Sequence, residues 1–155
     1  MVSDYAEKGV YSSANLTGGA IAGIVAGFAM GLLIQFVMGI TPVIGALYLG
    51  SPSLVAGWVA HMFHSIVFAL VFVALVSADP LNRYMDSRVH ATLAGAGYGA
   101  VLWVVAAVFV MPLWMQSIGL QGPGIPNINV QSLVGHVVFG GVLGAGYKVL
   151  LERLH

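Results

Sequence analysis

The distribution of charged residues constrains this chain more than any other feature of its sequence. The five Lys and Arg and the five Asp and Glu fall in three groups, so that residues 9–78 and 89–147 contain none of them. A membrane-spanning helix needs about 20 apolar residues, and each charge-free segment is long enough for two. Charged residues make up only 6% of the chain, whereas a soluble domain carries about 25%. We therefore predict an integral membrane protein.

Several other classes of protein are excluded by what the sequence lacks. The chain has no cysteine, which excludes disulfides, thiolate metal sites and cysteine nucleophiles. Its formal net charge is zero, so no basic patch indicates a nucleic-acid partner. The first 18 residues are polar and partly acidic, which is not the pattern of a signal peptide. The first apolar segment is therefore expected to stay in the mature protein.

Four helical spans are predicted within a single membrane domain, 1–155. They cover about 15–40, 53–76, 90–115 and 130–151. Helices are expected because an open strand cannot satisfy its backbone polar groups in lipid. The segments are also too long and too uniformly apolar to be strands of a barrel, which alternate. Ser53 follows Pro52 at the start of the second span and is a suitable N-cap.

The basic residues predict the orientation of these spans. All five Lys and Arg lie before the first span, in the linker 78–89 or at the C-terminus. Cytoplasmic segments of membrane proteins carry an excess of Lys and Arg. We therefore expect a multi-pass protein of the cell membrane, with both termini and the linker in the cytoplasm.

The two connections on the other side of the membrane are unusually apolar. Segments 41–52 and 116–129 are uncharged and rich in glycine, proline and apolar residues. One interpretation is that they lie flat at the interface or pack over the bundle. The other is that they form a lid or contact a partner. The first is favoured, because irregular backbone near lipid must be covered by protein or water.

The two halves of the chain look like copies of each other. Similar triplets or quartets match at 21–23 with 93–95, at 36–38 with 109–111, and at 58–61 with 133–136. Each copy contains two spans, so the copies run parallel and are related by an axis along the membrane normal. The predicted fold is therefore an all-α four-transmembrane-helix bundle, built from a first repeat at about 15–77 and a second at about 90–151.

Glycines at a spacing of four residues indicate where helices approach closely. Small residues provide helix contacts in lipid, where no hydrophobic effect acts between helices. Such glycines occur in three of the spans: Gly19, Gly23, Gly27 and Gly31 in the first, Gly95 and Gly99 in the third, and Gly140 and Gly144 in the fourth. These seams could hold the bundle together or join two copies of the chain in a homo-oligomer.

Histidines are the only side chains in the spans that titrate near neutral pH. Intramembrane ionisable residues are candidates for function by default. His61 and His136 match in the repeat and are expected to face each other about 10 Å into the membrane, at 1.5 Å per residue. His64 lies one helical turn deeper on the face of His61. His90 and the terminal His155 are expected to be solvated.

Three interpretations of the intramembrane histidines stay open. In the first, they are neutral and form hydrogen bonds between helices. In the second, His61 and His136 ligate a haem b iron for electron transfer, with His64 replacing His61 if the spans are shifted by one turn. In the third, the histidines bind copper together with Met38 and Met111, which end the first and third spans at a similar depth.

The function classes follow from these interpretations. If haem binds, the chain is an electron-transfer component rather than an enzyme, because no catalytic acid–base pair lies in the spans. One alternative is a non-catalytic accessory or structural subunit of a larger respiratory or transport complex. A small pore or exporter is the second alternative, although polar residues are scarce. In each case the partners are lipid and other membrane subunits.

One segment carries a resemblance to a known group of proteins. The glycine-spaced first span ending in Met38, together with GWVAHMFHS at 57–65, resembles small four-helix membrane proteins of halophilic archaea. The resemblance implies four spans. It implies no activity.

Overall fold

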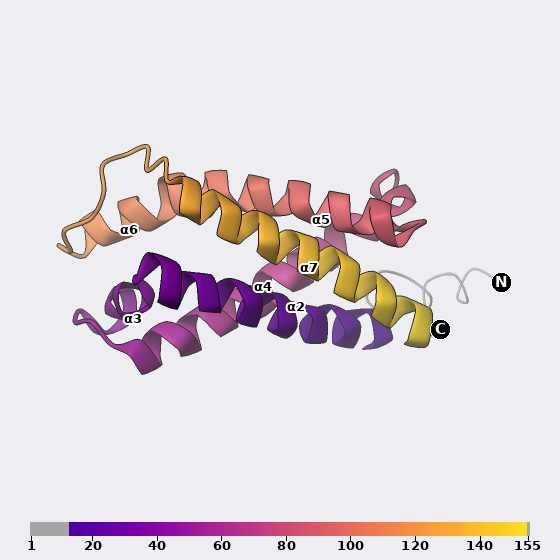
Figure 1. Cartoon of the computed structure of the whole chain (residues 1–155), viewed down its shortest axis with the longest axis horizontal. Coiled ribbons are helices and arrows are strands. Elements are labelled where there is room, and N and C mark those ends of the chain that lie inside the picture. The colour runs from indigo at the N-terminus through magenta and orange to yellow at the C-terminus, as the bar shows by residue number, and fades with distance from the viewer. Residues whose placement is uncertain (1–12, 155) are drawn as a thin grey trace.

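The computed structural model describes residues 13–154, and within that range every regular element is helical (Figure 1). Four of its helical stretches are long and apolar enough to cross a membrane: Asn15–Met38, Leu54–Val76, Arg88–Ser117 and Val130–Arg153. The four predicted helices are therefore confirmed, with ends within a few residues of those expected. Three of the ten charged residues, Asp4, Glu7 and Lys8, and the terminal His155 lie outside the described residues.

The first span changes helical type before it ends. Helix α2, Ser13–Leu33, continues into the π-helix η1, Ile34–Met38, which stops at Gly39 with φ 68°. A second helix follows directly, α3 at Thr41–Leu49, with Pro42 in its first turn. The segment 41–52, expected to be a loop, is thus largely a helix. Proline favours this start because its φ suits a first helical turn and its missing N–H is not needed there.

The second span begins where its capping residue predicts. Helix α4 covers Leu54–Val76, and the Oγ of Ser53 accepts a hydrogen bond from the backbone N–H of Ala56 at 3.3 Å. This bond satisfies one of the N–H groups that have no partner within the helix. The linker 78–89 then contains a short 3₁₀ helix, η2 at Leu81–Met85.

The third span repeats the sequence of elements found in the first. Helix α5, Arg88–Leu102, continues into the π-helix η3, Trp103–Val110, and then into α6, Met111–Ser117, which has a proline in its first turn. The connection that follows folds back on this span. Asn127 donates from its backbone N–H to Val108 O at 3.1 Å and from Nδ2 to Ala107 O at 3.4 Å.

The fourth span, α7 at Val130–Leu154, runs obliquely between α5 and α2 (Figure 1). Helix α2 packs on both α4 and α7, α5 packs mainly on α7, and α3 packs on α4. The 3₁₀ helix η2 packs on both α4 and α5. The chain thus forms two helix pairs, α2 with α4 and α5 with α7. The contact between α2 and α7 joins one pair to the other.

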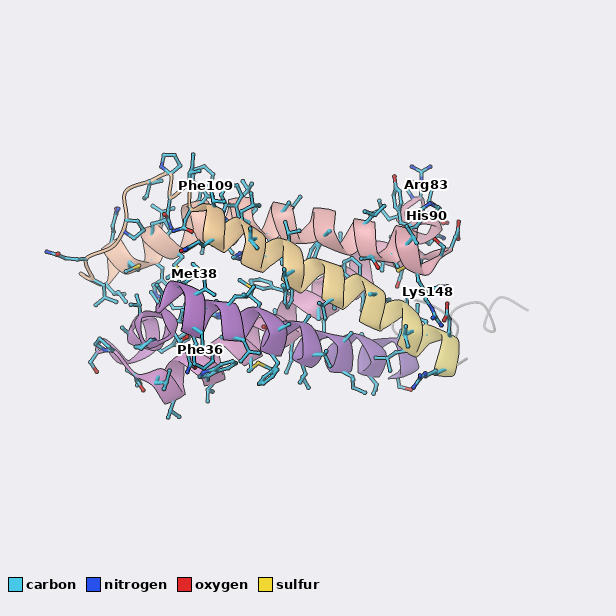
Figure 2. All side chains as sticks on the ribbon, in the orientation of Figure 1. Phe36, Met38, Arg83, His90, Phe109 and Lys148 are labelled. Atoms are coloured by element: carbon cyan, nitrogen blue, oxygen red, sulfur yellow. The ribbon has the colours of Figure 1, made fainter. Side chains whose placement is uncertain are left out.

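The described charged residues gather at one end of the bundle, here called the charged end. Arg83, His90 and Lys148 lie there, whereas Phe36, Met38 and Phe109 lie toward the opposite, uncharged end (Figure 2). Arg88 and Glu152 form an ion pair of 2.7 Å that joins the start of α5 to the end of α7. This pair is exposed, so it contributes little to stability.

Large buried side chains meet on the charged side of the bundle centre. Phe72 of α4 and Leu143 and Tyr147 of α7 are among the largest fully buried side chains. The rings of Phe72 and Tyr147 meet edge to face, with centroids 6.3 Å apart. Toward the uncharged end, a cavity lies between the helices.

Candidate functional site

An apolar cavity of about 190 Å³ lies between the helices in the uncharged half of the bundle. Helices α2, α4 and α7, both π-helices, α3 and α6 contribute to its walls. The candidate residues from the sequence all line it: His61, His64, His136, Met38 and Met111. All four spans therefore contribute to this set. The histidines come from the second and fourth spans, Met111 from the third, and Met38 from the end of the first. A third methionine, Met30 of α2, also lines the cavity and was missed by the sequence analysis.

The π-helices shape this cavity. Ile34 and Met38 of η1 and Ala107 of η3 are among its lining residues. Because a π turn holds an additional residue, it changes the face that the following residues present. Met38 and Met111 lie at the ends of the two π segments, one as the last residue of η1 and one directly after η3. Short π segments occur frequently at functional sites.

His61 is used to connect two helices. Its Nε2 lies 2.8 Å from the backbone carbonyl oxygen of Gly27 on α2. A carbonyl oxygen only accepts hydrogen bonds, so Nε2 carries the proton. The neutral ring is favoured because no acidic side chain of the described residues faces it and an unpaired charge in an apolar interior is costly. His61 is therefore a buried hydrogen-bond donor that ties α4 to α2, as the first interpretation of the histidines expects.

His136 is held differently. Its Nδ1 lies 2.8 Å from the carbonyl oxygen of Ser132, one turn earlier on the same helix. By the same reasoning Nδ1 donates, and Nε2 of the neutral ring bears a lone pair. Among residues 13–154 no side chain or backbone group is a hydrogen-bond partner for this Nε2. His136 thus contributes an unoccupied electron-pair donor to a cavity wall.

His64 is joined to the helix that covers the cavity at the uncharged end. Its Nε2 is hydrogen-bonded to the hydroxyl of Tyr48 on α3. A tyrosine hydroxyl is protonated at neutral pH, so Tyr48 can donate to this nitrogen. The ring of Tyr48 also meets Trp114 of α6 edge to face, with centroids 5.0 Å apart. Tyr48 therefore connects α3, α4 and α6 beside the cavity.

Toward the charged end, Tyr98 of α5 crosses to α4. Its hydroxyl donates to Phe68 O at 2.7 Å, and its ring lies 5.2 Å from that of Phe72. On the far side of Tyr98 lies a second cavity of about 390 Å³, bordered by Tyr84 and His90. His90 is exposed at this end, where the sequence placed it. Tyr98 thus separates the histidine-lined cavity from the charged end.

The donor set limits which groups the cavity could hold. No three His, Asp or Glu side chains within residues 13–154 lie close enough together to form a metal site. Haem ligation by two imidazoles uses a free ring nitrogen from each. His136 offers Nε2, whereas His61 has its Nε2 bound to Gly27 O and could offer only Nδ1. The volume of about 190 Å³ is also below the roughly 300–1,000 Å³ of ordinary ligand pockets. As arranged here, the pair does not fit a haem.

Comparison with known proteins identifies no relative from which a function could be transferred. No family model, no curated protein and no solved structure matches the chain. The chemistry of the histidine-lined cavity is therefore the basis on which a function is proposed.

Proposed function

We propose that this chain is a multi-pass protein of the cell membrane whose charged end faces the cytoplasm. The four long apolar helices support insertion, and the position of Arg83, Arg88, Lys148 and Arg153 supports the orientation. In this orientation the histidine-lined cavity lies in the outer half of the membrane, with α3 above it.

The same proposal includes an origin in two parallel repeats. Each half runs from a helix through a π segment and a short proline-containing helix to a long helix. The close contacts also match. Gly27 lies against Ser65 in the first half, and Gly99 lies against Gly140 in the second. These two pairs occupy corresponding positions in the repeat, and both halves contribute to the walls of the cavity.

The function that the geometry supports best is binding of an electron-pair acceptor inside the membrane. The observation that carries it is the Nε2 lone pair of His136 on the wall of the cavity, oriented by the bond from Nδ1 to Ser132 O. A hydrogen bond from the other ring nitrogen is what fixes the tautomer of a ligating imidazole. The acceptor is either a soft metal ion or the O–H or N–H of a small apolar molecule.

A purely structural role explains His61 better than His136. His61 forms a hydrogen bond between two helices, which is the usual use of a neutral histidine in a membrane. The bond of His136 stays within α7 and joins no helices. Loss of the two side chains should therefore have different consequences, and this difference makes the proposal testable.

The test is direct identification of what the protein carries. The protein is purified in mild detergent from its own membranes, and its bound metals and small molecules are measured by elemental analysis and native mass spectrometry. We expect a component bound at one per chain in the wild type and in His90→Ala, and its loss from His136→Ala with an unchanged helical spectrum. A wild-type protein that carries nothing and takes up nothing, or a His136→Ala variant that retains the component, would refute the proposal.

An optical spectrum of the same preparation tests the haem interpretation. Haem b would give a Soret band and reducible α and β bands, and ligation by both histidines would make His61→Ala and His136→Ala equally colourless. A band that depends on His136 alone would identify haem as the ligand but reject the pair. A colourless protein that copurifies with fixed partners would instead favour an accessory subunit.

A further inference from the structure

We propose that the cavity binds a single Cu(I) ion through Nε2 of His136 and the thioether sulfurs of Met38 and Met111. This inference rests on the proposed function and specifies its ligand. The three donors come from η1, from the start of α6 and from α7, and all three side chains line the cavity. The two methionines mark the ends of the π segments, and His136 belongs to a separate helix.

The donor types favour a soft ion. Thioether sulfur is a soft ligand that selects Cu(I), and imidazole also suits copper. A third methionine, Met30, lies on the same cavity, and its end packs beside Gly135, the residue before His136. The same cavity is therefore lined by three thioethers and one imidazole whose Nε2 is free of hydrogen bonds.

The charge of the site favours a monovalent ion. The cavity is lined by no Asp, Glu, Lys or Arg of the described residues, and the chain has no cysteine. A divalent ion would bring two positive charges into an apolar interior without a carboxylate or thiolate to neutralise them. Zinc would also need about four N, S or O ligands, and no suitable group exists among residues 13–154. Cu(I) binds to neutral soft donors and brings a single charge.

His61 and His64 are assigned a supporting part in this site. The Nε2 of each ring is already engaged, by Gly27 O and by the hydroxyl of Tyr48. His136 lines the same cavity, and its Nε2 has no hydrogen-bond partner among the described residues. Binding therefore requires no rearrangement of the bonds that join α4 to α2 and to α3.

The test uses the full-length protein in detergent, without oxygen and with a reductant, titrated with Cu(I) against the chromogenic chelator bicinchoninate. We expect one Cu(I) per chain, with sulfur and nitrogen neighbours by X-ray absorption. His136→Ala and the double variant Met38→Leu with Met111→Leu should each weaken binding at least about tenfold, since loss of even a supporting group has that effect at metal sites. Zn(II) should not compete.

The matched control is Met62→Leu. Met62 lies on α4 beside Gly27, one residue from His61, and does not line the cavity. It should leave the affinity for Cu(I) unchanged. Circular dichroism and elution volume confirm that each variant is folded, and a variant that fails is replaced by Met38→Leu or Met111→Leu alone.

The outcomes separate this inference from the proposed function. Wild-type protein that does not bind Cu(I), but carries an organic molecule that His136→Ala loses, overturns the copper site and leaves the proposed function standing. Cu(I) binding that none of the His136, Met38 and Met111 variants affects also overturns it. Absence of both copper and any other component refutes both.

Discussion

In both helix pairs of the molecule, α2 with α4 and α5 with α7, glycines lie at the helix contact. The pairs differ in what those glycines contact. In the first pair the glycines face side chains: a Cβ on Gly27 would lie 2.5 Å from Oγ of Ser65. In the second pair they face backbone, because a Cβ on Gly95 would overlap the carbonyl oxygen of Gly140, and a Cβ on Gly140 that of Gly95. Helices α5 and α7 are therefore in direct backbone contact, which glycine on both helices permits.

This difference explains why the two corresponding histidines are used differently. Between α2 and α4 there is room for the ring of His61 to reach Gly27 O. Between α5 and α7 the corresponding glycine, Gly99, lies directly against the backbone carbonyl of His136. With no space between the helices, the ring of His136 turns to Ser132 O and borders the cavity. The spacing of a helix pair thus decides whether a matched histidine joins helices or lines a cavity.

The largest expected effect is on the backbone contact. Gly140→Ala should destabilise the protein by about 3 kcal/mol, because the new methyl group overlaps Gly95 O and the backbones must move apart. The loss is measured as a lower midpoint of thermal unfolding in detergent. Gly97→Ala on α5 is the control, since no atom lies within 4 Å of its Cβ position. Equal midpoints for the two variants would mean that the α5–α7 seam is not tightly packed.

A smaller effect is expected from the corresponding change in the other pair. Gly27→Ala should cost about 1–2 kcal/mol, because it meets the small side chain of Ser65 rather than backbone. Adding Ser65→Gly removes the obstacle and should restore much of the lost stability. If Gly27→Ala is as damaging as Gly140→Ala, or if Ser65→Gly makes it worse, the proposed distinction between the seams is wrong.

Substitution of the two histidines should affect stability and ligand binding separately. His61→Ala removes the bond to Gly27 O and should lower the stability by about 1 kcal/mol, close to the value of hydrogen bonds between membrane helices. His136→Ala should cost less, because its bond lies within α7. A greater loss of stability in His136→Ala would contradict the assignment of His136 to the cavity. The measurement is unfolding of the ligand-free protein.

The smallest energetic effect is expected at the charged end. Arg88→Cys removes an exposed ion pair with Glu152 and should leave the midpoint of thermal unfolding almost unchanged, because solvent screens the pair. Comparing this variant with a separate Ser117→Cys variant, at the opposite end of the bundle, reports the orientation in the membrane. On intact cells a membrane-impermeant thiol reagent should label the Ser117 variant alone. Labelling of the Arg88 variant alone would reverse the proposed topology.

Most of the architecture could be predicted from the sequence because lipid imposes simple local rules. Charge-free segments of sufficient length must form helices, and Ser53 marks the start of α4 by its own hydrogen bond. The candidate residues were also found from the sequence, because polar residues are so rare in the spans. Met30 was missed, although its spacing of eight residues from Met38 was a readable signal.

Only the tertiary structure decided how those residues are used. The π segments and helix α3 depend on how the ends of the first and third spans pack, which no local pattern specifies. The partners of His61 and His136 depend on the distance between neighbouring helices, and that distance is set by which glycines meet which backbone atoms. The sequence by itself determined that the chain forms apolar helices with three histidines in them. Packing in three dimensions decided that only His136 presents an unengaged Nε2 to the cavity.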